Sequence, residues 1–173
     1  VAAATASAAN LSINEWLANS APGADDWVEL YNRSATAPVA LQVIHLAVSN
    51  ALHQLNALSF IPAGGYVQLL ADEGTGANHL DFKLPAVGGA IALYDANAAE
   101  LDRVNFGPQA QGVTQGRLPD GTPSLASFPA SPSPAASNYL LSYSGPVLNE
   151  MLAINRAAVT NGSGRTPDFV ELK

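Results

Sequence analysis

The sequence predicts an all-β protein with the architecture of a β-sandwich. Residues that favour turns recur at short intervals, for example in residues 61–65 and 118–121. The segments between these turns are short and either apolar or alternating, which is typical of the strands of a sandwich. The alternative to an all-β chain is a helix in one of two Ala-rich stretches, residues 1–10 or 98–101. Isolated helices shorter than about 12 residues are, however, marginal in water.

The first strands are expected in the N-terminal third of the chain. Residues 11–17 alternate Leu and Ile with Ser and Asn, and a β-prone run over residues 27–31 ends at the turn former Asn32. Residues 39–48 carry apolar side chains at both odd and even positions, which face opposite sides of a strand. That pattern predicts one central strand buried on both faces.

Further strands are expected after residue 56, and those at residues 90–94 and 101–106 are expected to form a hairpin. Segments 57–60 and 66–70 flank a Pro-Ala-Gly-Gly turn, and segments 90–94 and 101–106 flank Asp-Ala-Asn. Residues 113–118 then lead into an Asp-Gly dipeptide, which favours a tight hairpin.

A Pro/Ser/Ala segment over residues 128–138 marks the end of the main domain. Its prolines cannot donate to a β-ladder. We expect it either to lie as an extended strap over the sheet or to act as an inter-domain linker. The predicted organisation is therefore a linker or signal remnant (residues 1–10), a sandwich (residues 11–138), and a linker plus the truncated start of a second repeat (residues 139–173).

The expected second repeat rests on an internal echo. Residues 148–153 resemble residues 13–18, and residues 168–172 resemble residues 26–30, in the same order. Tandem repetition explains this, although strands also draw on a small residue alphabet. Because a two-stranded remnant cannot bury its own apolar face, residues 147–173 are expected to pack on the first domain, extend a sheet edge or self-associate with another copy; otherwise they stay disordered.

A series of short motifs resembles the bacterial lamin tail domain family over about residues 11–138. The resemblance implies an immunoglobulin-like β-sandwich. It does not extend to nuclear lamins, because the chain has no heptad rod, basic cluster or prenylation box. The motifs that carry it are Ile13-Asn14-Glu15, Asp26-Trp27-Val28-Glu29-Leu30-Tyr31-Asn32, Ile61-Pro62-Ala63-Gly64-Gly65-Tyr66, Asp81-Phe82-Lys83-Leu84, Ile91-Ala92-Leu93-Tyr94-Asp95 and Gly116-Arg117-Leu118-Pro119-Asp120-Gly121.

Composition and charge exclude several classes of function. The net charge is −7 with seven basic residues in total, so a nucleic-acid surface and docking on anionic membranes are not expected. No apolar run approaches the roughly 18 residues of a membrane span, so membrane insertion is not expected. A cysteine-free, Lys-poor chain rich in small residues favours an extracellular or cell-surface bacterial protein.

The densest acidic group consists of Glu15, Asp25, Asp26 and Glu29. Oxygen ligands from two adjacent strands are suited to Ca²⁺, which takes six to eight of them. The alternative is that Glu15 and Glu29 accept hydrogen bonds at a strand end while Asp25 and Asp26 are solvated. A carboxylate facing inward must be satisfied by donors, because burial otherwise costs several kcal/mol. No other cofactor is expected.

The sequence carries no catalytic signature. The three histidines, His45, His53 and His79, show no ligand spacing, and no Gly-x-Ser-x-Gly elbow or phosphate loop occurs. Trp16 is the candidate binding aromatic, since it fits the strand alternation poorly and indicates a bulge or strand end. The alternative for most of the aromatic side chains is packing in the core.

We therefore expect a non-catalytic structural or protein-interaction module with a protein or cell-envelope partner. The alternative is a carbohydrate or cell-wall binding module, with or without Ca²⁺.

Overall fold

The structure, a computed structural model, describes residues 5–49, 51–55, 60–142 and 145–173. Over these ranges it is almost entirely β, with fourteen strands and one 3-10 turn, η1 (Ala8–Asn10). None of its helical segments there is long and apolar enough to cross a membrane. The chain divides into two compact units, Val1–Leu141 and Ser142–Lys173, and each is described by itself.

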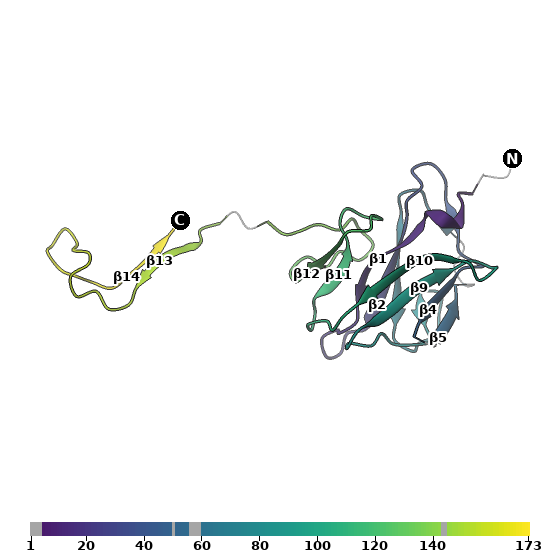
Figure 1. The fold of residues 1–173 in the computed structure, drawn as a ribbon, viewed down its shortest axis with the longest axis horizontal. Coiled ribbons are helices and arrows are strands. Elements are labelled where there is room, and N and C mark those ends of the chain that lie inside the picture. The colour runs from purple at the N-terminus through teal and green to yellow at the C-terminus, as the bar shows by residue number, and fades with distance from the viewer. Residues whose placement is uncertain (1–4, 50, 56–59, 143–144) are drawn as a thin grey trace. The chain divides into compact units, whose positions relative to one another are not determined.

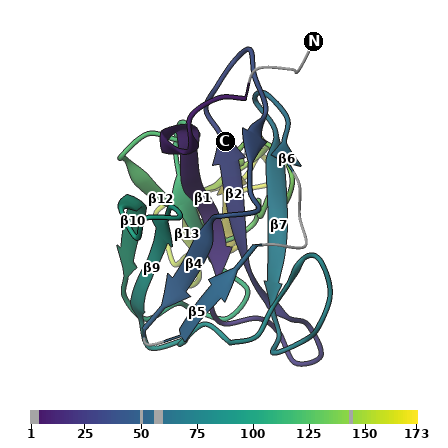
Figure 2. The ribbon, with the colours of Figure 1, turned by 90° about the vertical axis from the view of Figure 1, so that its right-hand side faces the viewer.

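The first unit contains a six-stranded sheet with β1 and β2 near its centre (Figures 1 and 2). All neighbours are antiparallel except β7 and β8, which are parallel. In sheet order the strands are β12 (Leu125–Phe128), β11 (Thr114–Arg117), β1 (Leu11–Leu17), β2 (Asp26–Asn32), β7 (Tyr66–Ala71) and β8 (His79–Leu80).

A four-stranded antiparallel sheet forms the second layer (Figure 2). A two-stranded sheet pairs β3 (Val39–Ala40) with β6 (Phe60–Ile61). In order, the strands of the four-stranded sheet are β10 (Glu100–Phe106), β9 (Gly89–Tyr94), β4 (His45–Val48) and β5 (Ala51–Gln54).

The core lies between the two layers. Ile13, Trp16 and Val28 are fully buried on the six-stranded side, and Leu46 and Leu93 on the four-stranded side. Burying each large apolar side chain stabilises the fold by roughly 1.5–3 kcal/mol. The prediction of an all-β sandwich is confirmed.

The prediction of one central strand over residues 39–48 is wrong. The chain instead makes a turn, in which the Ile44 amide donates to the Leu41 carbonyl at 2.9 Å. Leu41 and Ile44 stay buried while Val43 between them is 49% exposed. The two-sided apolar pattern therefore arises because β3 and β4 belong to different sheets, and the turn carries the chain from one to the other.

The other predicted strands agree with the structure to within a few residues. The hairpin of β9 and β10 forms around Asp95. Residues 98–101, for which a helix was the alternative, form no helix and lead into β10. The hairpin of β11 and β12 is not tight, because seven residues separate the two strands. Most of the expected strand 57–60 lies outside the described residues.

The second unit contains one antiparallel hairpin of β13 (Leu148–Leu152) and β14 (Phe169–Leu172). Its connecting loop is closed by Asn161, whose amide donates to the Arg165 carbonyl at 2.8 Å. The echo identified in the sequence thus corresponds to two paired strands.

Candidate functional site

Two glutamates lie directly opposite each other on the central strands of the six-stranded sheet. A β-bulge between Ile13 and Glu15 shifts the register, so that Glu15 pairs with Glu29 and Trp16 with Val28. The bulge keeps Trp16 on the core side together with Ile13, while both carboxylates stand on the opposite face. Glu15 and Glu29 are nevertheless fully buried, so another part of the chain covers them.

The cover is the Pro/Ser/Ala segment that follows β12, here called the strap (residues 129–138). The Ser133 amide donates to Glu15 Oε2 at 3.1 Å, and its hydroxyl also lies 3.1 Å from that oxygen. The Ala135 amide donates to Glu29 Oε2 at 2.5 Å. Thr114 in β11 donates to Glu15 from the side. Strap and sheet are therefore joined through buried carboxylate oxygens.

Asn14, the residue in the bulge, connects this pair to a third carboxylate. Its Nδ2 donates to Glu29 Oε1 at 3.1 Å and to Asp120 Oδ1 at 3.0 Å, and its Oδ1 accepts from the Gly121 amide at 3.0 Å. Asp120 also accepts from the Tyr66 hydroxyl at 2.8 Å and from the Asn138 amide at 3.0 Å. The end of the strap is therefore held by the turn after β11.

Burial sets the protonation of the pair. It raises the pKa of Glu29 to about 8, against the lowering effect of the hydrogen bonds from Asn14 and Ala135. Burial also raises the pKa of Glu15, although Thr114 and Ser133 donate to it. For Asp120, burial would raise the pKa, but hydrogen bonds from Ser137, Asn138 and Asn14 outweigh it, and the pKa is lowered.

An ion pair connects the two layers beside this site. Arg117 of β11 donates from Nη2 to Asp102 Oδ1 of β10 at 2.7 Å, and both side chains are largely buried. Arg117 Nε also donates to the Ile13 carbonyl at 2.8 Å, and the Ile13 amide donates to Asp102 Oδ2 at 2.8 Å. These bonds clamp the strand segment just before the bulge.

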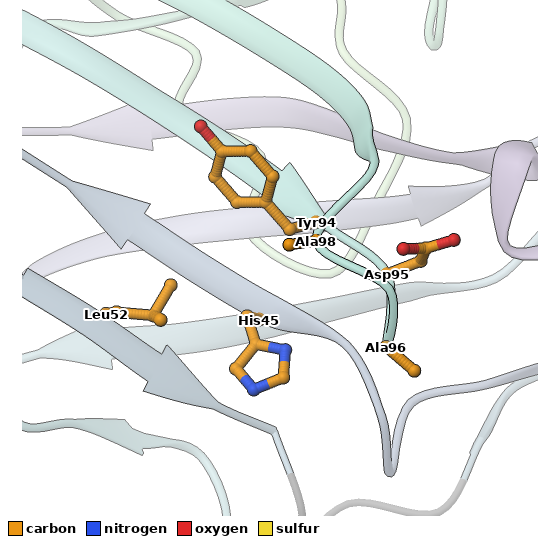
Figure 3. A pocket seen from close by; sticks show the side chains of 6 residues that line it. All are labelled: His45, Leu52, Tyr94, Asp95, Ala96 and Ala98. Carbon is orange, nitrogen blue, oxygen red and sulfur yellow. The ribbon is translucent and has the colours of Figure 1, made fainter.

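A separate shallow pocket of about 320 Å³ lies on the face of the four-stranded sheet that is turned away from the core. Figure 3 shows the Tyr94 ring, His45 and Leu52 around it, next to the turn that follows β9. Asp95 lies in the turn at its edge, where its Oδ1 accepts from the amides of Asn97 and Ala99 at 2.8 and 2.9 Å. The lining of the pocket is mainly apolar, with one aromatic wall.

A family model for the Lamin Tail Domain matches residues 4–108. The chain belongs to the lamin tail domain family. This membership indicates an immunoglobulin-like protein-interaction module. The comparison with curated proteins finds no match. The matched region contains β1, β2 and the four-stranded sheet of the lamin tail domain; β11, β12 and the strap follow it.

Of the four predicted calcium ligands, the lamin tail domain brings only two together. Glu15 and Glu29 are adjacent, but their oxygens accept from strap and strand donors. Asp26 lies three residues before Glu29, roughly 10 Å along the strand, and accepts from the Ser20 amide at 2.9 Å. Asp25 is exposed in the preceding turn. The described residues contain no group of three His, Asp or Glu side chains arranged to hold a metal.

The aromatic and histidine candidates are dispersed. Trp16 is fully buried, with its ring centroid 6.0 Å from that of Phe106, so the expectation of a surface aromatic there is not met. His53 Nδ1 lies 3.0 Å from Asp81, and His79 Nδ1 lies 2.7 Å from Asp72. The bulge that disturbs the alternation at Trp16 is present, but it points the indole inward.

Sequence reasoning missed the residues that complete the site, above all Asn14, Thr114 and Asp120. The Asp-Gly dipeptide at residues 120–121 predicts a turn, but it does not indicate that the Asp120 carboxylate accepts hydrogen bonds from Asn14, Tyr66 and the strap. The available signal was the requirement that an inward-facing carboxylate find donors, combined with a strap rich in backbone amides and hydroxyls.

Proposed function

We propose that this chain is a non-catalytic structural or protein-interaction module of a secreted or cell-surface bacterial protein. One observation carries the proposal: exposed apolar surface is concentrated outside the sandwich. Of the fifteen large hydrophobic residues that are exposed in the described part of the chain, seven belong to residues 145–173. Exposed apolar surface gathered in one place marks an interaction site.

The carboxylates of the sandwich support the non-catalytic part of this proposal. A general acid or base must reach its substrate. Glu15 and Glu29 are fully buried under the strap and accept hydrogen bonds from Ser133 and Ala135. Asp120 is held by four donors, among them Tyr66. These groups therefore serve to hold the strap in place.

The secreted, bacterial setting rests on composition. The chain has no cysteine and only two lysines, and its net charge of −7 favours solubility and disfavours binding to nucleic acid. A carbohydrate or cell-wall binding function is the second candidate. The pocket beside Tyr94 favours it, because sugar rings stack on exposed aromatic faces in apolar hollows.

Binding of the full chain, fused to a reporter, to bacterial envelope fractions tests both candidates, with and without Ca²⁺. A protein-interaction module should lose its binding when the fractions are treated with protease. A carbohydrate binder should keep binding after protease treatment, lose it after glycan digestion, and lose it in a Tyr94→Ala variant. Release of soluble product from the fractions by the chain alone would contradict a non-catalytic role.

A further inference from the structure

Two acidic side chains face each other beneath the strap. Glu15 of β1 lies directly opposite Glu29 of β2, a placement that brings the Cβ atoms of antiparallel strands to about 4.5–5.5 Å. Both residues are fully buried. Two negative charges repel strongly at this separation where water is excluded, because the effective dielectric constant is low there. The buried site therefore suits a pair that shares one proton and carries a single charge.

The groups that touch this pair donate hydrogen bonds but bring no positive charge. Within the described ranges, the donors to the two carboxylates are uncharged amide and hydroxyl groups. They come from the bulge, from β11 and from the strap: Asn14, Thr114, Ser133 and Ala135. On β7, the residue opposite Glu29 is Gln68, which is also uncharged. None of these contacts comes from a cation, so a second negative charge on the pair stays unbalanced.

The titratable groups on the surrounding elements do not compensate for this. Burial raises the pKa of both glutamates, and the negative charge of Asp120 in the turn after β11 raises it further. Tyr66 of β7 donates to Asp120 and supplies no positive charge. Arg117 donates to β10 on the core side of the sheet, and Arg33 donates to backbone carbonyls just before β1. The charge that faces the pair is thus negative.

The strap is attached to the sheet through the same carboxylates. Ser133 and Ala135 donate to the two glutamates, and Ser137 and Asn138 donate to Asp120. Asn138 Nδ2 also donates to backbone carbonyls of β1 and β11, at 3.2 and 2.9 Å. One ionised carboxylate with its neutral partner can accept all the strap donors. A change in the charge of the pair therefore acts directly on the attachment of the strap.

Backbone strain is present at the point where the strap meets Glu29. Ala135 has a φ of 64°, in the left-handed region that residues with a Cβ rarely adopt. It lies in a turn in which the Ala136 amide donates to the Ser133 carbonyl at 3.0 Å. Such a conformation persists only while the surrounding contacts hold it. The strap is therefore the part of this face that separates first when those contacts weaken.

The sandwich beneath the strap is held together by other contacts. The fully buried side chains of Ile13 and Leu30 pack in the core on the opposite face of β1 and β2. On that side the ion pair of Arg117 and Asp102 joins the two layers at 2.7 Å. Local opening of one segment while the rest stays folded is common where its contacts are few. The strap can thus leave the sheet without loss of the sandwich.

We propose that the strap is a latch that opens under alkaline conditions while the sandwich stays folded. In the closed state the pair of Glu15 and Glu29 holds one proton and accepts hydrogen bonds from Ser133 and Ala135. Loss of that proton to the solvent leaves two negative charges in a buried site. Movement of the strap away from the sheet then lets water reach both carboxylates. This device goes beyond the proposed interaction function and does not depend on what the module binds.

The direction of the pH dependence follows from proton linkage. Burial raises the pKa of Glu29 to about 8 from 4.5 in the closed state, and exposure to water returns it towards its ordinary value. The closed latch therefore binds more protons than the open latch. Opening is favoured as the pH rises through about 8 and is disfavoured below it.

Carbon-detected NMR of the full chain on either side of pH 8 is the first test. Cα and carbonyl shifts do not depend on the exchange of amide protons with water. The signals of Ser133 and Ala135 should move towards the values of a disordered chain as the pH rises, while those of Leu46 and Leu93 in the core stay constant. Strap signals that do not move, or strap and core signals that change together, overturn the proposal.

Charge-neutral variants distinguish a latch from a merely structural contact. Glu29→Gln cannot ionise, so the strap should stay closed to a pH at least about one unit higher, a tenfold change in proton concentration. A merely structural role for Glu29 predicts the opposite, since Gln offers one acceptor oxygen fewer and the strap would open at lower pH. Glu15→Gln tests the same pair from β1 and should act in the same direction.

Glu171→Gln is the matched control, because Glu171 is exposed in the second unit. It should leave the pH at which the strap opens unchanged. An unchanged or lowered opening pH in a folded Glu29→Gln or Glu15→Gln variant overturns the proposal. A shift in Glu171→Gln as large as that in Glu29→Gln also overturns it, because the effect would then come from net charge and not from the buried pair.

Discussion

The strand pairs β1–β2 and β13–β14 have the same register, the same bulge and nearly the same residues, yet one is the centre of a packed sandwich and the other is exposed. The comparison separates what a strand pair builds by itself from what its surroundings add. Pairing, bulge and the Asn-to-Glu hydrogen bond are local. Burial of the apolar face and the closed strap belong to the covered copy.

The largest expected difference between the copies is at the central apolar position. Trp16→Ala should lower the free energy of unfolding of the sandwich by about 3–5 kcal/mol, because it empties a fully buried site. Met151→Ala should change the stability of the sandwich by less than about 0.5 kcal/mol, as for exposed positions generally. Urea unfolding followed by circular dichroism measures both, at a concentration where the chain is monomeric. Equal effects would contradict the assignment of a core to β1–β2 alone.

The bulge asparagine should show the next largest contrast. Asn14→Ala removes donors from Glu29 and Asp120 and the acceptor for Gly121, and should cost about 2–3 kcal/mol, since a hydrogen bond to a charged group such as Asp120 is worth roughly 1.5–3 kcal/mol. Asn149→Ala removes only the exposed bond to Glu171 and should have little effect. Hydrogen exchange of the strap amides of Ser133 and Ala135 measures the consequence directly. Unchanged protection in Asn14→Ala would refute the role of Asn14 in holding the strap.

Close packing beneath the strap gives a third contrast. Gly116 pairs with Glu15, and a Cβ there would lie 2.5 Å from the Asn14 carbonyl oxygen and 2.8 Å from Asn138 Nδ2. Gly116→Ala should therefore cost about 1–3 kcal/mol, as overpacking does. Gly162→Ala in the second unit, where no atom lies within 4 Å of the added Cβ, is the control. Thermal unfolding compares the two, and a stable Gly116→Ala variant would count against a tight strap.

The last contrast is a dependence of stability on pH. The pKa of Glu29 is raised to about 8 in the folded state from 4.5, so the folded state binds more protons than the unfolded state between these values. The stability from this group is full below pH 4.5 and falls as the pH rises towards 8, by at most about 1.4 kcal/mol per pH unit. Glu29→Gln should flatten the profile, and Glu171→Gln should leave it unchanged. Chemical unfolding at several pH values measures the slope; a stability that rises over this range would contradict the buried pair.

The sequence predicts the sandwich well where one rule dominates. Alternation places β1, and the turn residues around Asp95 delimit β9 and β10. The prediction from sequence fails at residues 39–48. Apolar residues at both odd and even positions fit one strand that is buried on both faces equally well as two strands of different sheets. Only the packing of Leu41 and Ile44 into the core distinguishes the two. Trp16 was misplaced for a related reason, since alternation shows a bulge but not the direction in which the indole points.

The same division holds for the candidate site. The sequence by itself determined the all-β class, the β9–β10 hairpin, the position of the strap and the repetition of the Asn-Glu pattern, because these follow from periodicity, turn chemistry and residue identity close in the chain. Tertiary structure decided that Glu15 and Glu29 accept from Ser133 and Ala135, more than 100 residues away, and that the same pattern at Glu150 and Glu171 is exposed. Burial and hydrogen-bond satisfaction depend on segments that are distant in the chain, so only the folded arrangement distinguishes the two copies.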